Sequence, residues 1–433
     1  MIRIVIVGAG PAGGTLAVWL AAAGLPPLLI DAEQSAGGGG WRGIEGDRLR
    51  QAIASSHLDY RPNTEVIDIA ADGRLTLLGP SGRLTVETAD LLVLAPGATE
   101  RSLPVPGWTL PGVLSLGALQ RLLKRDDMRP TGPLALVGSG PLLRLVAAQM
   151  ATAGVNLSAV VDAGRPIDLG LLSGLANRPA ALIQGLRLEL RRRLAGIPLI
   201  HGFPVALHGD TRVESVELAD GRLIETALVG LGFGLQSNSE LARLAGLRLT
   251  WAPEWSAWLP ERNANFQSSR ENIFILGDGA GLGGMAVAEA EAICLAGTII
   301  ESAKRPLPAG LASARRRAES RLPALRKAGQ ALVAWSQVSP ANLAALPDSA
   351  IVCRCEGSTV GSVRAALEAG YRSSGTIKLA SRAGMGLCQG RGCEAGLRCL
   401  LEAAGLAPSH VPPGTVRPPL RPVPASAFLK ETP

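Results

Sequence analysis

Four of the six cysteines stand in two close pairs toward the carboxyl end of the chain. One residue separates Cys353 from Cys355, and four residues separate Cys388 from Cys393. Thiolates are soft ligands, and four of them suit a tetrahedral zinc ion or an iron–sulfur cluster. Structural zinc sites favour wider spacing within a pair, so the first pair favours a cluster. The spacing predicts an iron–sulfur site, with zinc or plain reduced thiols as the alternatives.

Short elements must position these cysteines. A helix is expected over 359–369, ending at Gly370, and residues 373–379 then connect to a glycine-rich turn before the second pair. Another helix is expected to start near Cys393. Arg354 and Arg391 stand beside ligands, where a positive charge would favour the reduced cluster; the alternative is plain solvent exposure. Cys399 and Cys294 are interpreted as packing residues.

The amino-terminal segment has the pattern of a dinucleotide-binding turn. Residues 2–7 are a largely apolar run, as expected of a strand buried on both faces of a parallel sheet. A G-x-G-x-x-G pattern and a helix follow, and an acid stands 23 positions after the first glycine, where a ribose is bound. The candidate contacts are Gly8, Gly10, Pro11, Ala12, Gly13 and Asp31.

Further candidate contacts to the same ligand lie farther along the chain. A run of four glycines at 37–40, followed by Trp41 and Arg42, suggests backbone and a cation beside a phosphate; Arg42 as a surface residue is the alternative. Residues 91–98 are a strand and a turn, and residues 273–281 are a strand ending in Gly-Asp. The candidates here are Gly38, Arg42, Ala95, Gly97, Gly277 and Asp278.

The pattern of a strand, a glycine-rich turn and a later acid is repeated in the middle of the chain. Residues 134–137 are a strand, followed by Gly138 and Gly140, but Leu143 replaces the third glycine. Asp162 stands 24 positions after Gly138, at the end of the next strand. The pattern leaves two interpretations open: a second nucleotide bound by Gly138, Gly140 and Asp162, or a βαβ unit kept for architecture.

The composition and length limit the possible fold classes, partners and cellular locations of the protein. The 433 residues include 53 Gly and 31 Pro with 47% hydrophobic residues, which indicates an α/β protein of more than one domain. The net charge is +7, and arginine runs such as 191–193 have no interleaved aromatic residues, so no nucleic-acid partner is expected. No signal peptide or transmembrane helix is expected, and peripheral membrane association stays open. Thiols at ligand spacing favour the cytoplasm.

The segment between the nucleotide folds and the cysteines has a helical pattern. One helix is expected over 311–322, ending before Pro323, and a second helical stretch over 332–346, broken by Pro340 and Pro347. The proline-rich tail from Pro408 is expected to be extended, wrapping a partner or loose.

The order of these motifs resembles the two-dinucleotide-fold flavoproteins of the glutathione-reductase type. Residues 8–13, Asp31, 94–98 and 277–278 carry the resemblance, which implies FAD in the first domain. Disulfide reductases of that group keep a redox cysteine pair in a nucleotide domain. Because the first cysteine here is Cys294, that disulfide chemistry is excluded.

Residues 97–113, 138–143 and 277–284, together with the Cys-x-Cys and Cys-Gln-Gly-Arg-x-Cys motifs, narrow the resemblance. The chain is similar to the α subunits of bacterial multi-subunit flavin dehydrogenases: opine oxidases, proline and hydroxyproline dehydrogenases, and hydrogen cyanide synthase. Its C-terminal part resembles the [2Fe-2S] domain of bacterioferritin-associated ferredoxin. The resemblance implies FAD and a [2Fe-2S] cluster on Cys353, Cys355, Cys388 and Cys393, and leaves open NAD(P) or ATP in the second fold or FMN at a subunit interface.

The expected fold class is α/β: two Rossmann-like domains of the glutathione-reductase type and a small, mainly helical [2Fe-2S] domain. The expected domains are an FAD-binding domain (1–112 and 238–302), a second nucleotide-binding-like domain (113–237), a helical linker (303–348), the cluster domain (349–405) and a Pro-rich tail (406–433).

The resemblance predicts an electron-transfer subunit of an amino-acid, imino-acid or opine dehydrogenase. A flavin-dependent β subunit would carry the substrate site, and a small third subunit stays open. The four histidines stand in no motif, so no catalytic base is assigned to this chain. Two alternatives remain: a stand-alone NAD(P)H-dependent ferredoxin-type reductase, against which Leu143 counts, and a zinc-stabilised scaffold without enzymatic activity.

Overall fold

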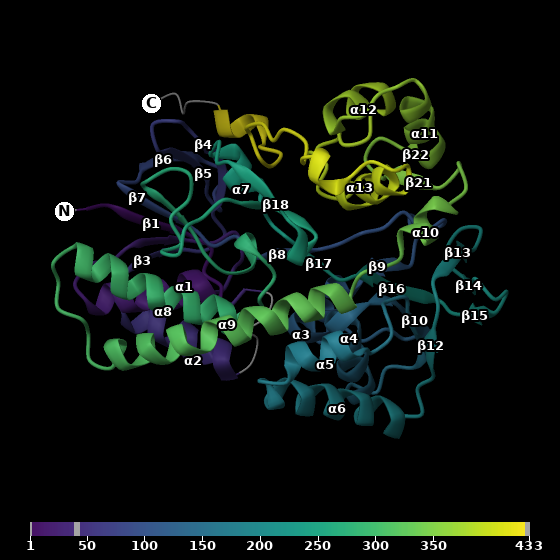
Figure 1. Cartoon of the computed structure of the whole chain (residues 1–433), viewed down its shortest axis with the longest axis horizontal. Helices are drawn as coiled ribbons and strands as arrows, with labels where there is room; N and C mark the ends of the chain where they lie inside the picture. Colours follow the sequence, from purple (N-terminus) through teal and green to yellow (C-terminus); the bar gives the residue numbers. More distant parts are fainter. Residues whose placement is uncertain (1, 39–43, 429–433) are drawn as a thin grey trace. The chain divides into compact units, whose positions relative to one another are not determined.

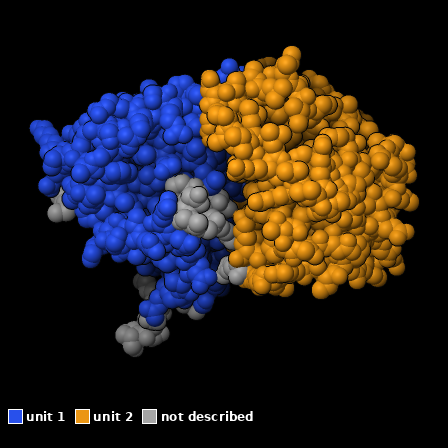
Figure 2. All heavy atoms as spheres, turned by 90° about the horizontal axis from the view of Figure 1, so that it is seen from below, with its two compact units in different colours: residues 1–99, 237–330, 415–433 blue, residues 100–236, 331–414 orange. Residues whose placement is uncertain are grey.

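The computed structural model describes residues 2–38 and 44–428. The chain divides into two compact units, which Figure 2 colours separately. The first unit contains residues 1–99, 237–330 and 415–433, and the second contains residues 100–236 and 331–414. The chain leaves the first unit near β8 (Ala98–Glu100), returns near β17 (Leu235–Ser237), and leaves it again within helix α9 (Leu311–Trp335).

A five-stranded parallel sheet forms the centre of the first unit (Figure 1). In spatial order its strands are β20 (Ile273–Ile275), β7 (Leu91–Leu94), β1 (Ile4–Val7), β2 (Leu28–Ile30) and β3 (Asp59–Arg61). Alternate side chains of β1 enter different cores, since Ile4 and Ile6 belong to one cluster and Val5 and Val7 to another. A strand covered on both faces must be apolar throughout, which explains the apolar residues 4–7.

Helices cover one face of this sheet, and an antiparallel sheet lies against the other. The helical side holds α1 (Pro11–Ala22), α8 (Met285–Ser302) and the first part of α9, with α2 (Ile44–Ser55) packed on α1. The other side holds β4 (Glu65–Ile69), β5 (Arg74–Leu78), β6 (Leu84–Thr88) and α7 (Glu240–Leu244). A hairpin of β18 (Leu249–Ala252) and β19 (Ala257–Pro260) completes the unit.

One expectation for the connecting segments is wrong, and one of the alternatives left open for the tail is excluded. Helix α9 continues through Pro323 instead of ending before it. Leu322 and Leu325 on either side of the proline are buried in the core of the first unit, and this burial offsets the backbone hydrogen bond that proline removes. The tail is not loose either: Leu420 donates its N–H to Ile67 O at 2.8 Å and is buried, so the tail packs on its own chain.

The second unit has its own five-stranded parallel sheet. In spatial order its strands are β12 (Leu199–His201), β11 (Leu157–Asp162), β10 (Leu134–Ser139), β16 (Leu228–Phe233) and β9 (Val113–Ser115). One face packs on α3 (Leu116–Asp126) and α4 (Gly140–Thr152), with α5 (Leu169–Leu175) and α6 (Pro179–Leu194) farther out. The other face packs on β13 (Pro204–His208), β14 (Ser215–Leu218) and β15 (Leu223–Glu225).

The cysteine-bearing segment also belongs to the second unit. It contains α10 (Pro340–Ala344), β21 (Ile351–Cys353), β22 (Ser358–Thr359), α11 (Val360–Glu368), α12 (Ser374–Ser381) and α13 (Glu394–Ala403). The Thr359 side chain caps α11 and Ser373 caps α12, so polar residues fix where these short helices start. The expected helices at 359–369 and near Cys393 are confirmed, whereas 373–379, expected as a connection, lies mostly in α12.

Two parallel sheets flanked by helices confirm the expected α/β class. Within the described ranges, no helix has both the length and the apolar character required to cross a bilayer.

Candidate functional site

The first glycine turn joins β1 to α1 without room for side chains. The Gly8 N–H donates to Ile30 O at 2.7 Å, and a Cβ on Gly13 would overlap the carbonyl oxygen of Gly8. Helix α1 can therefore start close to the strand, at Pro11 and Ala12. Gly10 is the N-cap residue and has no side chain that could cap the helix. The N–H groups of the first turn therefore stay available to a pyrophosphate bound beside the glycine turn.

A second loop comes back over this turn. Gly37 donates its N–H to Ala9 O at 2.9 Å, and a Cβ on Gly38 would lie 3.3 Å from the Cα of Gly10. Two glycines thus face each other, and the walls of the cradle are backbone. Arg42, the cation expected beside a phosphate, lies outside the described residues.

Asp31 follows β2 and lies beside the turn, as its position in the sequence predicts. Its carboxylate accepts the N–H of Ala9 and, at 2.7 Å, that of Glu33. Burial raises the pKa of Asp31 above its ordinary value, although the two backbone donors act in the opposite direction. Within the described residues its partners are backbone groups, which suits a carboxylate that can also accept a ribose hydroxyl.

The remaining candidates of the first unit lie around the same turn. Ala95 donates to Val7 O at 2.8 Å, and its carbonyl oxygen faces Gly8 so closely that a Cβ there would overlap it. Gly97 accepts the N–H of Asn238 at 3.1 Å. A Cβ on Gly277 would lie 3.2 Å from the Cβ of Ala12. Four segments distant in sequence thus meet at one edge of the sheet.

Asp278 lies in the turn that leads to α8. It accepts the N–H of Gly284 at 2.8 Å, and burial raises the pKa of its carboxyl above the ordinary value. The carboxylate therefore anchors the loop before the helix. A role in cofactor binding and a role in helix entry are compatible with this geometry, since the side chain has two oxygens.

Sequence reasoning missed a buried ion-pair cluster that fixes this turn. Glu291 is fully buried in α8; it bonds to Arg262 at 2.8 and 2.9 Å and to Arg326 at 2.8 Å, and accepts the Gly277 N–H at 2.9 Å. Burial alone would raise the pKa of Glu291, but the two guanidinium groups outweigh it and hold the pKa below the ordinary value. A glutamate within an otherwise apolar helix was the available signal.

The second glycine turn has the same backbone plan and different surroundings. A Cβ on Gly138 would overlap the carbonyl oxygen of Gly232, and a Cβ on Gly140 would overlap the Ser336 hydroxyl. Leu143, which replaces the third glycine, is buried against α3 and β10. The structure thus places Gly138, Gly140 and Asp162 together at the end of β10 and β11, as the sequence predicts.

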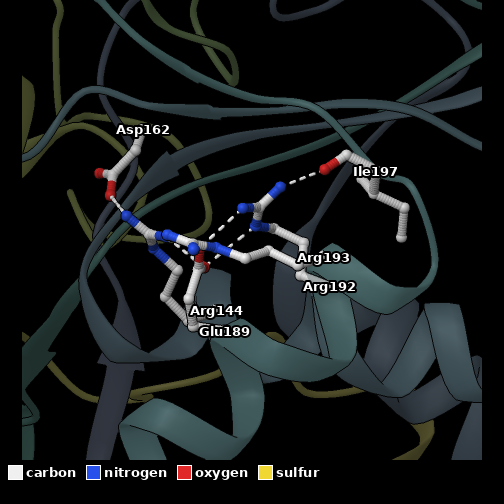
Figure 3. A network of polar contacts seen from close by, with 6 residues as sticks. All are labelled: Arg144, Asp162, Glu189, Arg192, Arg193 and Ile197. Atoms are coloured by element: carbon white, nitrogen blue, oxygen red, sulfur yellow. Dashed lines mark hydrogen bonds and ion pairs between the residues drawn. The ribbon is translucent and has the colours of Figure 1, made fainter.

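Asp162 already has a cationic partner, as Figure 3 shows. One carboxylate oxygen bonds to the Arg144 guanidinium at 2.5 Å, and the other accepts the Gly164 N–H at 3.0 Å. Arg144 also reaches Glu189 of α6, which pairs with Arg192 and Arg193. Hydrogen bonds from Arg192 lower the pKa of Glu189 to about 2, against the smaller effect of burial.

The four candidate ligand cysteines come together in two pairs. The sulfur atoms of Cys355 and Cys388 are 3.6 Å apart, and the side chains of Cys353 and Cys393 are hydrogen-bonded to each other. Cys353 and Cys393 are buried, whereas Cys355 is exposed. Within the described residues, no three side chains of His, Cys, Asp or Glu surround a single-ion position.

The donor set fits a two-iron cluster better than a single zinc ion. A [2Fe-2S] cluster takes four cysteine ligands, two on each iron, and the sulfurs lie in two such pairs. The Cys393 thiol and then the backbone N–H groups of Gly384, Glu356 and Cys355 lower the pKa of Cys353 to about 5, which favours the thiolate form that binds metal. A Cβ on Gly386 would overlap the Cβ of Cys355, so the backbone before the second cysteine pair passes close to this ligand.

Comparison with known proteins agrees with both parts of this site. Residues 2–304 match the family model described as pyridine nucleotide-disulphide oxidoreductase, and residues 351–403 match that of the BFD-like [2Fe-2S] binding domain. The chain belongs to the pyridine nucleotide-disulphide oxidoreductase family and ends in a BFD-like [2Fe-2S] domain.

Relatives extend the similarity over the whole chain. An opine oxidase subunit of Rhizobium meliloti is 35% identical, covering 97% of this chain and 96% of the relative. The hydrogen cyanide synthase subunit HcnB of Pseudomonas aeruginosa is 32% identical, covering 99% of this chain and 98% of the relative. The L-proline dehydrogenase structure from P. horikoshii has the same fold, with a TM-score of 0.73 at 14% identity over 99% of this chain and 79% of that one.

The resemblance drawn from the motifs is therefore confirmed. The chain is an FAD flavoprotein of the oxidoreductase class with a BFD-like [2Fe-2S] domain, homologous to this opine oxidase subunit and to HcnB. The assignment of individual site residues stays a prediction.

Proposed function

We propose that this chain is the electron-transfer subunit of a hetero-oligomeric dehydrogenase or oxidase acting on CH–NH or CH–NH₂ donors. A flavin-dependent partner subunit would oxidise the C–N bond of an amino acid, imino acid or opine and pass the electrons to this chain. The observation that carries the proposal is the presence, in one chain, of a backbone cradle suited to a dinucleotide and of two sulfur pairs suited to a redox cluster.

The residues divide the work between two sites. Gly8, Gly10 and Gly13 would let the FAD pyrophosphate approach the backbone, and Asp31 would accept a ribose hydroxyl. Ala95, Gly97, Gly277 and Asp278 would line the edge of the same cradle, and Arg42 would lie beside a phosphate. When bound, an FAD supplies two-electron chemistry and a [2Fe-2S] cluster supplies one-electron transfer.

The cysteine site would hold the cluster through Cys353, Cys355, Cys388 and Cys393, whose side chains lie in two close pairs. Backbone N–H groups directed at the Cys353 sulfur stabilise its negative charge, and such donors raise a cluster's reduction potential. The exposed Cys355 gives this pair an outward side, suited to electron exchange with a protein partner. A predicted domain limit of 349–405 encloses all of these elements.

An anaerobic reduction experiment tests the division of labour. We expect the flavin of the isolated, FAD-loaded chain to bleach negligibly with NADH. We expect it to bleach with an amino acid or opine when the co-purified β subunit is present. Rapid bleaching of the isolated chain by NADH would instead establish the ferredoxin-type reductase. The names of the relatives, an opine oxidase subunit and HcnB, support testing the complex first.

Substitution of a ligand tests the cluster separately. We expect Cys353→Ser to remove iron, acid-labile sulfide and the red-shifted visible bands, while the FAD content stays unchanged. Cys399→Ser is the matched control, because Cys399 is a half-buried packing residue of the same segment. Equal iron in both variants, or stoichiometric zinc in the wild type, would contradict the assignment.

We also propose a cytoplasmic location, since free thiols at ligand spacing persist in a reducing compartment. A small third subunit and an FMN at a subunit interface stay part of the proposal for the complex. Gel filtration of the co-expressed complex with flavin extraction would reveal both.

A further inference from the structure

The end of helix α9 lies on the second glycine turn. A Cβ on Gly140 would overlap the Ser336 hydroxyl, and a Cβ on Gly234 would lie 3.3 Å from the Ser336 Cβ. The second glycine of this motif is the position where the pyrophosphate of a dinucleotide approaches the backbone. Ser336 is itself buried, so a side chain of this protein fills the position that a phosphate would take.

Hydrogen bonds from both sides hold this segment in place. The Ser139 hydroxyl donates to Ser336 O at 2.7 Å, and the Arg165 N–H donates to Trp335 O at 3.1 Å. The buried Arg101 guanidinium donates to Ser336 O at 3.2 Å and to Gln337 Oε1 at 2.7 Å. A nucleotide entering here would have to break these bonds. The buried Arg101 guanidinium would then lose two acceptors and keep Phe233 O at 2.8 Å, which is costly for a buried charge.

The carboxylate expected to bind a ribose is engaged as well. Asp162 is 2% exposed and is paired with Arg144, and the Arg144 guanidinium lies 6.0 Å from the centre of the Trp335 ring. The same tryptophan that belongs to the covering segment therefore also covers the cation that neutralises Asp162 (Figure 3 shows the ion pairs). The phosphate position and the ribose position are closed by one set of contacts.

We propose that residues 335–337 close the second nucleotide site from within the chain, so that NAD(P)H and ATP do not bind there while the segment is in place. The residues do not fit a bound nucleotide, and hydride therefore has no entrance to this protein through its second fold. This inference stands on the geometry of the second unit alone and is independent of the proposed donor.

Calorimetric titration of NADH, NADPH and ATP into the FAD- and cluster-loaded protein tests the closure. We expect the wild type to bind none of them at roughly 1 mM, a concentration at which even weak sites fill. We expect Trp335→Ala/Ser336→Gly to gain affinity at least tenfold over the wild type. Ala334→Gly is the matched control, because Ala334 is exposed on the same helix end and should leave the site closed.

Gln337→Ala provides a milder opening, since it removes one acceptor of Arg101 and leaves the helix intact. Visible absorbance of flavin and cluster shows whether each variant is folded. Nucleotide binding by the wild type would overturn the proposal. If the two opened variants keep both cofactors and still bind nothing, the altered turn at Leu143 excludes nucleotides and the segment is not the cause, which also overturns it.

Discussion

The two nucleotide folds use the same sequence device and differ in what lies opposite its second glycine. In the first unit Gly10 faces the backbone of Gly38, and in the second unit Gly140 faces the side chain of Ser336. The acids that follow the second strand differ in the same way. Asp31 accepts backbone N–H groups, whereas Asp162 is paired with Arg144.

The difference shows that a dinucleotide-binding motif specifies the backbone conformation of the turn. The motif does not by itself show that a nucleotide binds there. Both turns let a helix start close to a strand, which serves the architecture of either unit. A turn whose backbone is uncovered can accept a phosphate. A turn that is already covered by another segment of the same chain cannot. Whether a turn binds is therefore decided by the segment that packs over it.

Removing the glutamate at the centre of the ion-pair cluster of each fold should have the largest effect on stability, and the two folds should differ most in this test. Glu291→Ala leaves Arg262 and Arg326 without their buried partner, and we expect a loss of about 3–5 kcal/mol of stability and release of FAD. Glu189→Ala, in the second fold, should cost about 1 kcal/mol or less, because Glu189 is 27% exposed. Urea unfolding followed by flavin fluorescence measures both; equal losses would contradict the contrast.

Adding one methyl group to each turn gives the next largest effect. In Gly13→Ala the new Cβ would overlap Gly8 O, so α1 must move, and we expect the FAD content to fall at least tenfold. In Gly140→Ala the new Cβ would overlap Ser336 instead, and we expect unchanged FAD and a lower melting temperature. The ratio of flavin to protein in each purified variant measures these effects. A loss of FAD in Gly140→Ala would show that the two folds are not independent.

The smallest expected effect is a difference in acid sensitivity. The folded-state pKa of Glu291 is lowered, so its contribution to stability is complete above its unfolded pKa and is lost as pH falls through the folded value. The same sign holds for Glu189, whose window extends down to a pKa of about 2. Glu291→Gln should flatten the decline of stability below about pH 4.5. A decline unchanged in slope would exclude Glu291 as its source.

Much of the local structure could be predicted from the residues. The apolar runs, the glycine spacing and the acids after the second strands predict both βαβ units, and the structure has them. The cysteine spacing predicts one site, and the structure brings the four thiols together in two pairs. These features depend on neighbours close in sequence or on a repeated motif, and such patterns are readable without the fold.

Other features depend on packing between distant segments. Pro323 predicts a helix end, but burial of Leu322 and Leu325 keeps α9 continuous, and Ser336, directly after this helix, packs on the second turn. Glu291 looks out of place in an apolar helix until Arg262 and Arg326 are seen around it.

The sequence by itself determined the two nucleotide folds, the cysteine site and the order in which they follow one another, because spacing along the chain fixes turns, strands and ligand pairs. The tertiary structure decided which nucleotide turn stays bare. Ser139 and Ser336 are 197 positions apart and meet through one hydrogen bond. No local pattern encodes such a contact, since it arises only when the end of a helix packs on a loop that is far away in the sequence.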